Sequence, residues 1–96
     1  MWKKLSSGKK IASGVICDGP CLYFGFVCLP GGVNRTVTLY DELTATGNEV
    51  EDFIANANLP SDGHSHSNPV VCSKGLYLAL GGGSVVVYYA PYNMNT

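Results

Sequence analysis

The residues best suited to chemistry in this chain of 96 residues are two histidines and four cysteines. His64 and His66 lie two positions apart, so both imidazoles point to one side if the segment is extended. Two imidazoles are too few for a closed transition-metal site in one chain, although three copies meeting on an axis would supply enough. Two solvated histidines in a Ser-, Asn- and Gly-rich loop are the simpler interpretation. We therefore predict no cofactor and no metal, with His64 and His66 as the only candidate ligands.

The cysteines, at positions 17, 21, 28 and 72, have neither the spacing of a zinc module nor that of a CxxC motif. An Asp-Gly-Pro turn separates Cys17 from Cys21 and can bring these two thiols close together. The N-terminal segment does not resemble a secretion signal, because its apolar stretch is short and no small-residue cleavage site follows. We expect reduced thiols, buried or in loops, and keep a disulfide as the alternative.

Acidic residues gather in the middle of the chain, at Asp41, Glu42, Glu49, Glu51 and Asp52. Nothing in their spacing fixes two carboxylates at the separation that a glycosidase needs, and no calcium loop of the EF-hand type is present. We predict a solvated acidic rim. Because no nucleophile and base stand out either, we predict that the chain is not an enzyme.

Composition indicates a folded chain with a partly covered surface. Charged residues make up 14% of the chain, against roughly 25% in ordinary domains. A net charge of −1 argues against a nucleic-acid partner, and no apolar run approaches the roughly 18 residues of a membrane span. Four of the six basic residues nevertheless lie in the first ten positions. We predict a flexible basic arm over residues 1–10, a single domain over 11–92 and a tail over 93–96; a merely solvated terminus is the alternative.

Alternating apolar residues predict strands along most of the chain. A strand is expected near residues 11–17, and another at 21–29 with apolar residues on both faces, which is typical of a central strand or one that contacts another subunit. Its expected faces are Leu22, Phe24, Phe26 and Cys28 on one side, and Tyr23, Gly25, Val27 and Leu29 on the other. In the strand that ends at Asp41, Val37 and Leu39 should face the core.

In the second half of the chain, secondary structure is predicted less clearly for residues 48–69 than for residues 76–89. Residues 48–60 fit a strand or one helical turn, and residues 59–69 read as a loop. Residues 76–80 and 85–89 alternate on either side of three glycines and predict a hairpin with one core face. Five to eight short strands with regularly spaced turns indicate an all-β fold, either a small antiparallel β-sandwich or a jelly-roll-like barrel.

The order of three segments resembles that of small virion proteins from tailed phages. The segments are ASGVICDGPCLYFGFVC, TVTLYDELTATGNEV and VVCSKGLYLALGGGSVVVYYAP. The shared pattern is an A/S-G-V-I strand, a second strand after a short Gly or Pro turn, a T-L-Y-D strand followed by a Thr-, Ala- and Gly-rich loop, and a G-L-Y hairpin ending in V-x-Y. The four cysteines and the GHSHSN segment depart from this pattern.

The resemblance implies a bacteriophage virion structural protein, most simply a capsid decoration or cement protein that binds the assembled shell as a homotrimer. The expected partners are the major capsid protein or another virion protein, with no nucleic acid and no membrane. The expected location is the virion, after synthesis in the host cytoplasm. The alternative is a carbohydrate- or receptor-binding β-sandwich module of a tail or head fibre, since Tyr88, Tyr89 and Tyr92 are suited to sugar stacking as well as to interfaces.

This hypothesis assigns two sets of contact residues. The arm is expected to bind the capsid through Trp2, Lys3, Lys4, Lys9 and Lys10. The apolar strand and the Tyr-rich end are expected to build the subunit interface through Tyr23, Val27, Tyr89 and Tyr92. Deleting residues 1–10 should then weaken shell binding and leave the fold intact.

Overall fold

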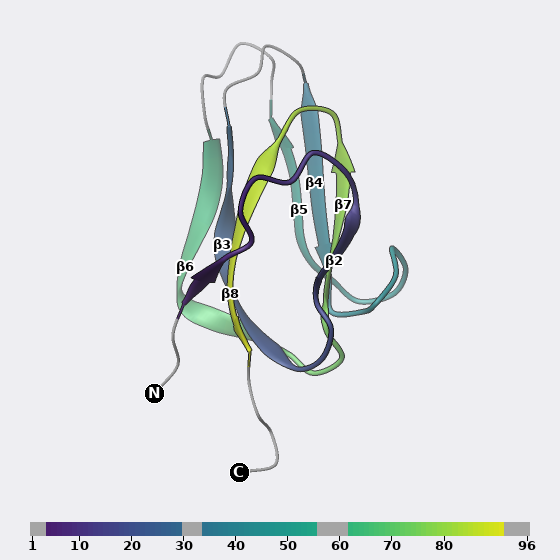
Figure 1. Ribbon diagram of the computed structural model, residues 1–96, viewed down its shortest axis with the longest axis vertical. Helices are drawn as coiled ribbons and strands as arrows, with labels where there is room; N and C mark the ends of the chain where they lie inside the picture. The colour runs from purple at the N-terminus through teal and green to yellow at the C-terminus, as the bar shows by residue number, and fades with distance from the viewer. Residues whose placement is uncertain (1–3, 30–33, 56–61, 92–96) are drawn as a thin grey trace.

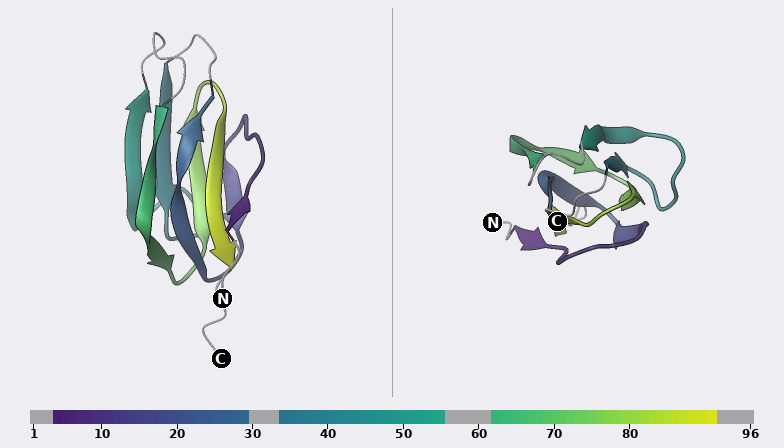
Figure 2. Two further views of the ribbon diagram at one scale, coloured as in Figure 1. Left: turned by 90° about the vertical axis from the view of Figure 1, so that its left-hand side faces the viewer. Right: turned by 90° about the horizontal axis from the view of Figure 1, so that it is seen from above.

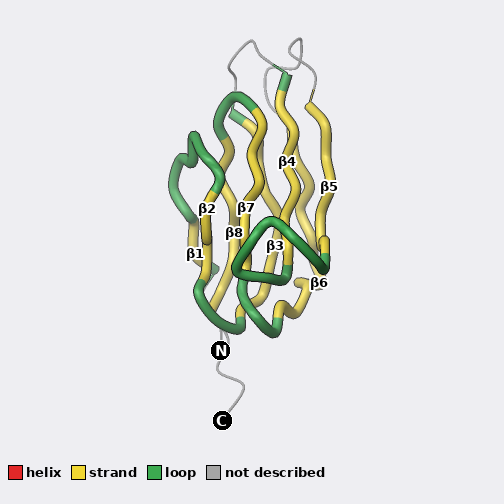
Figure 3. Tube along the Cα trace, turned by 90° about the vertical axis from the view of Figure 1, so that its right-hand side faces the viewer, coloured by secondary structure: helices red, strands yellow, loops and turns green. Residues whose placement is uncertain are grey.

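The computed structural model describes residues 4–29, 34–55 and 62–91, and these ranges contain eight strands and no helix, as the alternation predicts (Figure 3). No segment within them is therefore a helix able to cross a membrane. The strands are β1 (Leu5–Ser6), β2 (Gly14–Cys17), β3 (Cys21–Cys28), β4 (Arg35–Tyr40), β5 (Glu49–Ala55), β6 (Asp62–Cys72), β7 (Leu76–Gly81) and β8 (Val85–Pro91).

The strands form two antiparallel sheets that face each other (Figures 1 and 2). The strand orders are β1-β8-β3-β6 in one sheet and β2-β7-β4-β5 in the other. Strand pairs β1 with β8, β2 with β7, β3 with β6 and β4 with β5 therefore form a long ribbon that is rolled into a sandwich. This is the jelly-roll arrangement, one of the two predicted forms.

The expected hairpin of residues 76–80 and 85–89 is wrong in its pairing. Strand β7 lies in one sheet and β8 in the other, so the connection crosses the sandwich. Gly82 and Gly83 have φ values of 82° and 67°, which favour glycine and allow this sharp crossing. The core faces are nevertheless confirmed, because Leu76, Leu78, Val85 and Val87 are fully buried.

Strand β3 is a central strand, as expected, but the prediction of its faces is wrong. A bulge between Tyr23 and Gly25 shifts the register with both neighbours, β6 and β8. Gly25 has a φ of 132°, and a side chain there would collide with the backbone of His64. Beyond the bulge the parity changes, so that the residues facing the core are Cys21, Tyr23, Phe26 and Cys28.

The core between the sheets receives one face of β4. Val37 and Leu39 are fully buried, which confirms the prediction. Arg35 and Asp41 have the same parity and are buried as well. Arg35 donates a hydrogen bond through its Nη1 to the carbonyl of Leu29, and the partners of Asp41 are described below.

The segment predicted as a loop around residues 62–69 is part of the long strand β6. Its polar sequence lacks the β-branched and aromatic residues that signal a strand, but it pairs with β3 on either side of a large irregularity. There, the single residue Phe24 of β3 stands opposite residues 66–69 of β6. Strand β6 bends at its lower end (Figure 1). The ambiguous segment before it forms strand β5, not a helical turn.

Residues 4–10 lie along the edge of the sandwich. Leu5 and Ser6 pair with β8, and Lys10 exchanges two main-chain hydrogen bonds with Val85, at 2.8 and 3.0 Å. Ser7 adds bonds to the N–H and carbonyl of Val87. Within the described part of the chain, the segment expected as a flexible arm is thus a short edge strand and its continuation.

Candidate functional site

A groove lies on the outer face of the β1-β8-β3-β6 sheet. Its volume is about 330 Å³, and its lining includes Phe24, Tyr88, Val27, Gly63 and Ser65. The backbones of β3 and β6 approach closely here, since a side chain at Gly63 would collide with the carbonyl of Phe26. The absence of a side chain at Gly63 therefore permits the close approach of the two strands at the groove.

Lys4 closes one side of the groove. Its Nζ lies 5.6 Å from the ring centroid of Phe24 and 5.4 Å from that of Tyr88, a distance at which a cation and an aromatic face attract each other. The groove therefore combines the rings of Phe24, Phe26 and Tyr88 with Lys4, His64 and the hydroxyl of Ser65. Pockets of this size and composition are typical of small-ligand sites.

The predicted capsid-binding residues separate into two places. Lys4 lies at the groove, while Lys9 and Lys10 belong to the connection from β1 to β2, which crosses from one sheet to the other (Figure 1). That connection lines a second hollow of about 290 Å³ and presents Ile11 with 74% of its surface exposed. Trp2 and Lys3 lie outside the described residues.

The predicted interface residues do not share one surface. Tyr23 is fully buried between the sheets because the bulge at Gly25 turns it inward, so it offers no area to another subunit in this fold. Tyr89 is partly buried and packs against the core. Val27 is half-buried on the outer face beside the groove, and Tyr92 lies outside the described residues.

A second candidate site joins the two sheets at their open edge, where β5 and β6 end the two strand orders. The Glu51 carboxylate accepts hydrogen bonds from His64 Nδ1 at 2.8 Å and from His66 Nε2 at 2.7 Å. It also accepts one from the Tyr23 hydroxyl, at 3.1 Å. The side chain of Glu51 is only 9% exposed, so the expectation of a solvated carboxylate is wrong for this residue.

The two imidazoles are held by aromatic neighbours. The His64 ring packs edge-on against Phe53, with centroids 4.8 Å apart, and against Phe26, with centroids 5.7 Å apart. The His66 ring lies 5.5 Å from that of Tyr23. The expectation of a loop is therefore wrong, because both histidines lie on β6 and bond to Glu51, but His64 is exposed as expected.

Electrostatics in this cluster favour an ionised Glu51. Burial acts to raise the pKa of its carboxyl, but hydrogen bonds from His66, His64 and Tyr23 outweigh burial and hold the pKa below the ordinary glutamate value. Burial, followed by the charge of Glu51, raises the pKa of Tyr23 far above its usual value. Tyr23 thus remains a donor, and the cluster is a buried carboxylate that accepts hydrogen bonds from two imidazoles and one phenol.

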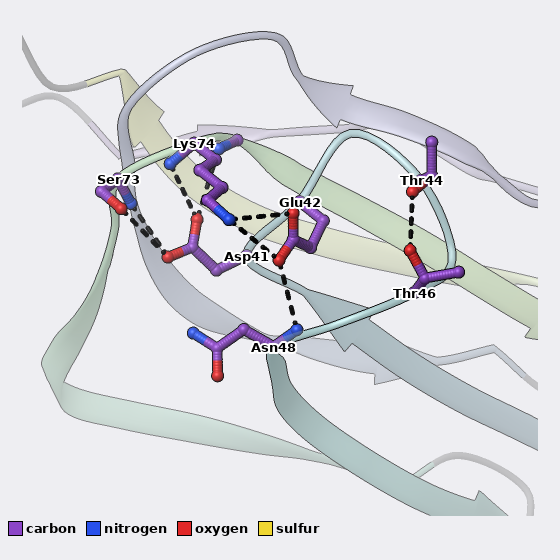
Figure 4. Close-up of polar contacts among 8 residues, drawn as sticks. Asp41, Glu42, Thr44, Thr46, Asn48, Ser73 and Lys74 are labelled. Carbon is purple, nitrogen blue, oxygen red and sulfur yellow. Dashed lines mark hydrogen bonds and ion pairs between the residues drawn. The ribbon is translucent and has the colours of Figure 1, made fainter.

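Asp41, the last residue of the T-L-Y-D segment, anchors the turn between β6 and β7 (Figure 4). Its carboxylate accepts the main-chain N–H groups of Lys74 at 2.8 Å, Ser73 at 3.1 Å and Gly75 at 3.4 Å. Burial acts to raise the pKa of Asp41, but these bonds outweigh it and lower the pKa. Asp41 is buried, so the predicted acidic rim is wrong here too.

The remaining acids are nearer to the predicted rim. Glu49 and Asp52 are exposed, and Glu42 forms an ion pair with Lys74 at 3.3 Å (Figure 4). Within the described ranges, no group of three or more His, Cys, Asp or Glu residues is arranged to hold a metal ion. Both histidine rings are directed at Glu51.

Sequence reasoning missed the groove, because its lining comes from β3, β6 and β8, strands that are far apart along the chain. The positive φ of Gly25 has no local sequence signal other than the glycine itself. Glu51 could have been suspected, since it alternates with Phe53 and so shares a face with an apolar residue. No protein-family model, curated protein or solved structure matches the chain.

Proposed function

We propose that the chain is a phage virion structural protein, a capsid decoration or cement protein that binds the assembled shell and stabilises it. One observation supports this proposal most directly: the outer face of the β1-β8-β3-β6 sheet is apolar at its centre. Val27 of β3 pairs with Val86 of β8, and Phe24 and Tyr88 lie beside them. All four side chains are only partly buried.

An apolar outer face is unusual because the solvent face of an antiparallel sheet normally carries polar residues. A contiguous apolar patch on a protein surface marks a place where a partner binds. The low charged fraction of the chain points in the same direction. Jelly rolls occur in capsid and lectin domains, which is a fold-level analogy and carries less weight than the patch itself.

Such a protein would stabilise the capsid through the coupling of its binding to shell assembly. A ligand that binds only the assembled shell adds its binding free energy to the stability of that shell. We favour a homotrimer, because three copies around an axis multiply weak contacts by avidity. In this arrangement the apolar face meets the shell or the neighbouring subunit, and Lys9 and Lys10 meet acidic groups on the capsid surface.

The test is native mass followed by co-sedimentation with shells of the encoding phage assembled without this protein. The variant Val86→Lys places a charge at the centre of the apolar face. Ile54→Lys is the matched control, because Ile54 is 73% exposed and lies on β5 of the other sheet. We expect a trimer that pellets with shells, at least about tenfold weaker binding for Val86→Lys, and unchanged binding for Ile54→Lys.

A monomer that stays in the supernatant with wild-type sequence would overturn the decoration proposal. Equal loss of binding in both variants would show that the apolar face has no special part in it. A mass that falls when a chelator is added would instead support a metal shared between subunits by His64 and His66.

A second function is favoured by the groove itself: a carbohydrate- or receptor-binding module of a tail or head fibre. Phe24 and Tyr88 offer ring faces for a sugar, while Lys4 and Ser65 offer hydrogen-bond donors. Glycan binding measured by calorimetry should be lost in Tyr88→Ala and kept in Val86→Thr. No binding across a broad glycan set would remove this alternative.

A further inference from the structure

Three of the four cysteines meet at one end of the sandwich, although they come from three strands. Cys17 is the last residue of β2, Cys21 the first of β3 and Cys72 the last of β6. All three carry free thiols. Cys21 and Cys72 belong to the buried core and are partners across β3 and β6, and Cys17 packs against this core, so the three thiols gather in one cluster.

The register of β3 and β6 places Cys21 and Cys72 at the Cα separation that a disulfide spans. They are direct partners in the antiparallel pairing of β3 with β6, and both side chains face the core and are fully buried. Directly opposed residues in such a pair have Cα atoms about 4.5 to 5.5 Å apart. This lies inside the range of about 4.4 to 6.8 Å that disulfides span.

Cys17 is the member of the cluster that solvent reaches. It is only partly buried, and the exposed Asp18 follows it at the start of the turn into β3. Burial raises the pKa of the Cys17 thiol, so its reaction should accelerate with rising pH. Cys21 and Cys72, in contrast, are closed to any reagent from outside while the fold persists.

We propose that these cysteines form a thiol–disulfide exchange site, in which Cys17 accepts a small disulfide such as oxidised glutathione and the oxidation is stored as a Cys21–Cys72 disulfide. The proposal is independent of the function suggested above. It predicts a chain that is reduced in a reducing compartment and becomes cross-linked between β3 and β6 in an oxidising one.

The reaction proceeds by three exchanges. The Cys17 thiolate attacks one sulfur of oxidised glutathione, breaks its S–S bond and expels one glutathione thiolate. Cys21 attacks the Cys17 sulfur and expels the second glutathione, which takes the Cys21 proton as it leaves. Cys72 then attacks Cys21 and releases Cys17, which takes the Cys72 proton. Overall, two protein thiols lose two electrons and two protons, and one glutathione disulfide becomes two glutathione thiols.

Cys28 provides an internal control. It lies on the same strand as Cys21 and is equally buried, but its partners across the sheet are Asp62 and Val85. An oxidation that depended only on burial or on cysteine content would treat Cys28 like Cys21. An exchange that depends on the register of β3 and β6 would leave it reduced.

The test uses the full chain, reduced and then exposed to oxidised glutathione, quenched with acid, alkylated and digested with trypsin. Cleavage after Lys10, Arg35 and Lys74 puts Cys17, Cys21 and Cys28 in one peptide, 11–35, and Cys72 in another, 36–74. A Cys21–Cys72 bond therefore links two peptides, whereas a Cys17–Cys21 bond remains within one. Fragment ions identify the linked cysteine.

We expect the two peptides to become joined by a bond between Cys21 and Cys72. In Cys28→Ala this linked pair should form at the wild-type rate. In Cys17→Ala it should form at least about tenfold more slowly, because a buried pair must then wait for opening of the fold. The fragment ions of the wild-type chain identify the linked cysteines directly, so the test does not depend on whether a Cys21→Ala variant folds. Glutathione that stays on Cys17 without any linked peptide would overturn the proposal, and so would linkage through Cys28. An unchanged rate in Cys17→Ala would remove the relay.

Discussion

Asp41 and Glu51 are both buried carboxylates, but they are satisfied in opposite ways. Asp41 accepts three main-chain N–H groups from one turn, and the chain cannot withdraw these donors without undoing that turn. Glu51, on β5, accepts hydrogen bonds from side chains. Two of these donors are imidazoles of β6, at the open edge of the sandwich. The donors of Asp41 are fixed by the fold of the backbone, while each donor of Glu51 can be removed by a single side-chain substitution.

The largest effect is expected at the backbone-held carboxylate. Asp41→Ala leaves three N–H groups of the turn at residues 73–75 without their acceptor and should lower the free energy of unfolding by about 3 kcal/mol. Urea unfolding monitored by far-UV circular dichroism measures this change in the free energy of unfolding. Asp52→Ala is the control, because Asp52 is exposed and accepts the hydroxyl of Thr38 at 3.3 Å, with no main-chain N–H bonded to it in the described ranges. Equal losses in the two variants would contradict the role given to Asp41.

The next effect is expected at Glu51. Glu51→Gln keeps the shape of the side chain but removes the charge that three donors face, and should cost about 2 kcal/mol at pH 7. The folded-state pKa of Glu51 is lowered, so its stabilisation is fully present above the unfolded value. The stabilisation is lost as the pH falls through the folded-state pKa. The unfolding curves of the two proteins should therefore converge in acid, and a difference that persists there would assign the loss to packing.

A smaller effect is expected at the two histidines. Replacing His66 with Ala or His64 with Ala removes one hydrogen-bond donor from Glu51, so burial is opposed by fewer donors and the pKa of Glu51 should rise. We expect a rise in both variants, since the hydrogen bonds of His66 and His64 both lower that pKa. Carboxyl NMR titration reads the shift directly, and the carboxyl of Asp41 in the same spectra should not move. A shift of both carboxyls would indicate a general loosening of the fold.

The smallest effect is expected for the ion pair of Lys74 with Glu42. The Lys74 side chain is 64% exposed, so Lys74→Ala should change the unfolding free energy by only about 0.3 kcal/mol. Added salt should abolish that difference. The main-chain N–H of Lys74, which bonds to Asp41, is retained in the variant. A loss comparable to that of Asp41→Ala would show that the ion pair, not the backbone, holds the turn.

Deletion of the N-terminal segment is now expected to do more than weaken a contact. Residues 5–10 donate and accept main-chain hydrogen bonds along β8, so removing residues 1–10 would expose the edge of strand β8. The charge reversals Lys9→Glu and Lys10→Glu test the basic residues without removing this pairing.

Alternation of apolar and polar residues predicted some strands well, because it depends only on neighbouring positions of the chain. The alternation through Val37 and Leu39 identifies a half-buried strand wherever that strand pairs. The same rule failed in β3, where the bulge at Gly25 changes the parity, and in β6, whose polar residues become a strand only because β3 lies beside it.

Short antiparallel strands around one apolar core can be predicted from the amino-acid sequence, since alternation and turn residues act over a few neighbouring positions. The pairing of the strands, the placement of β7 and β8 in different sheets and the contact of His64 and His66 with Glu51 follow only from the folded chain. These contacts join residues distant along the chain, and their register follows from packing of the whole sandwich. The groove, the carboxylate cluster and the cysteine cluster all belong to this second class.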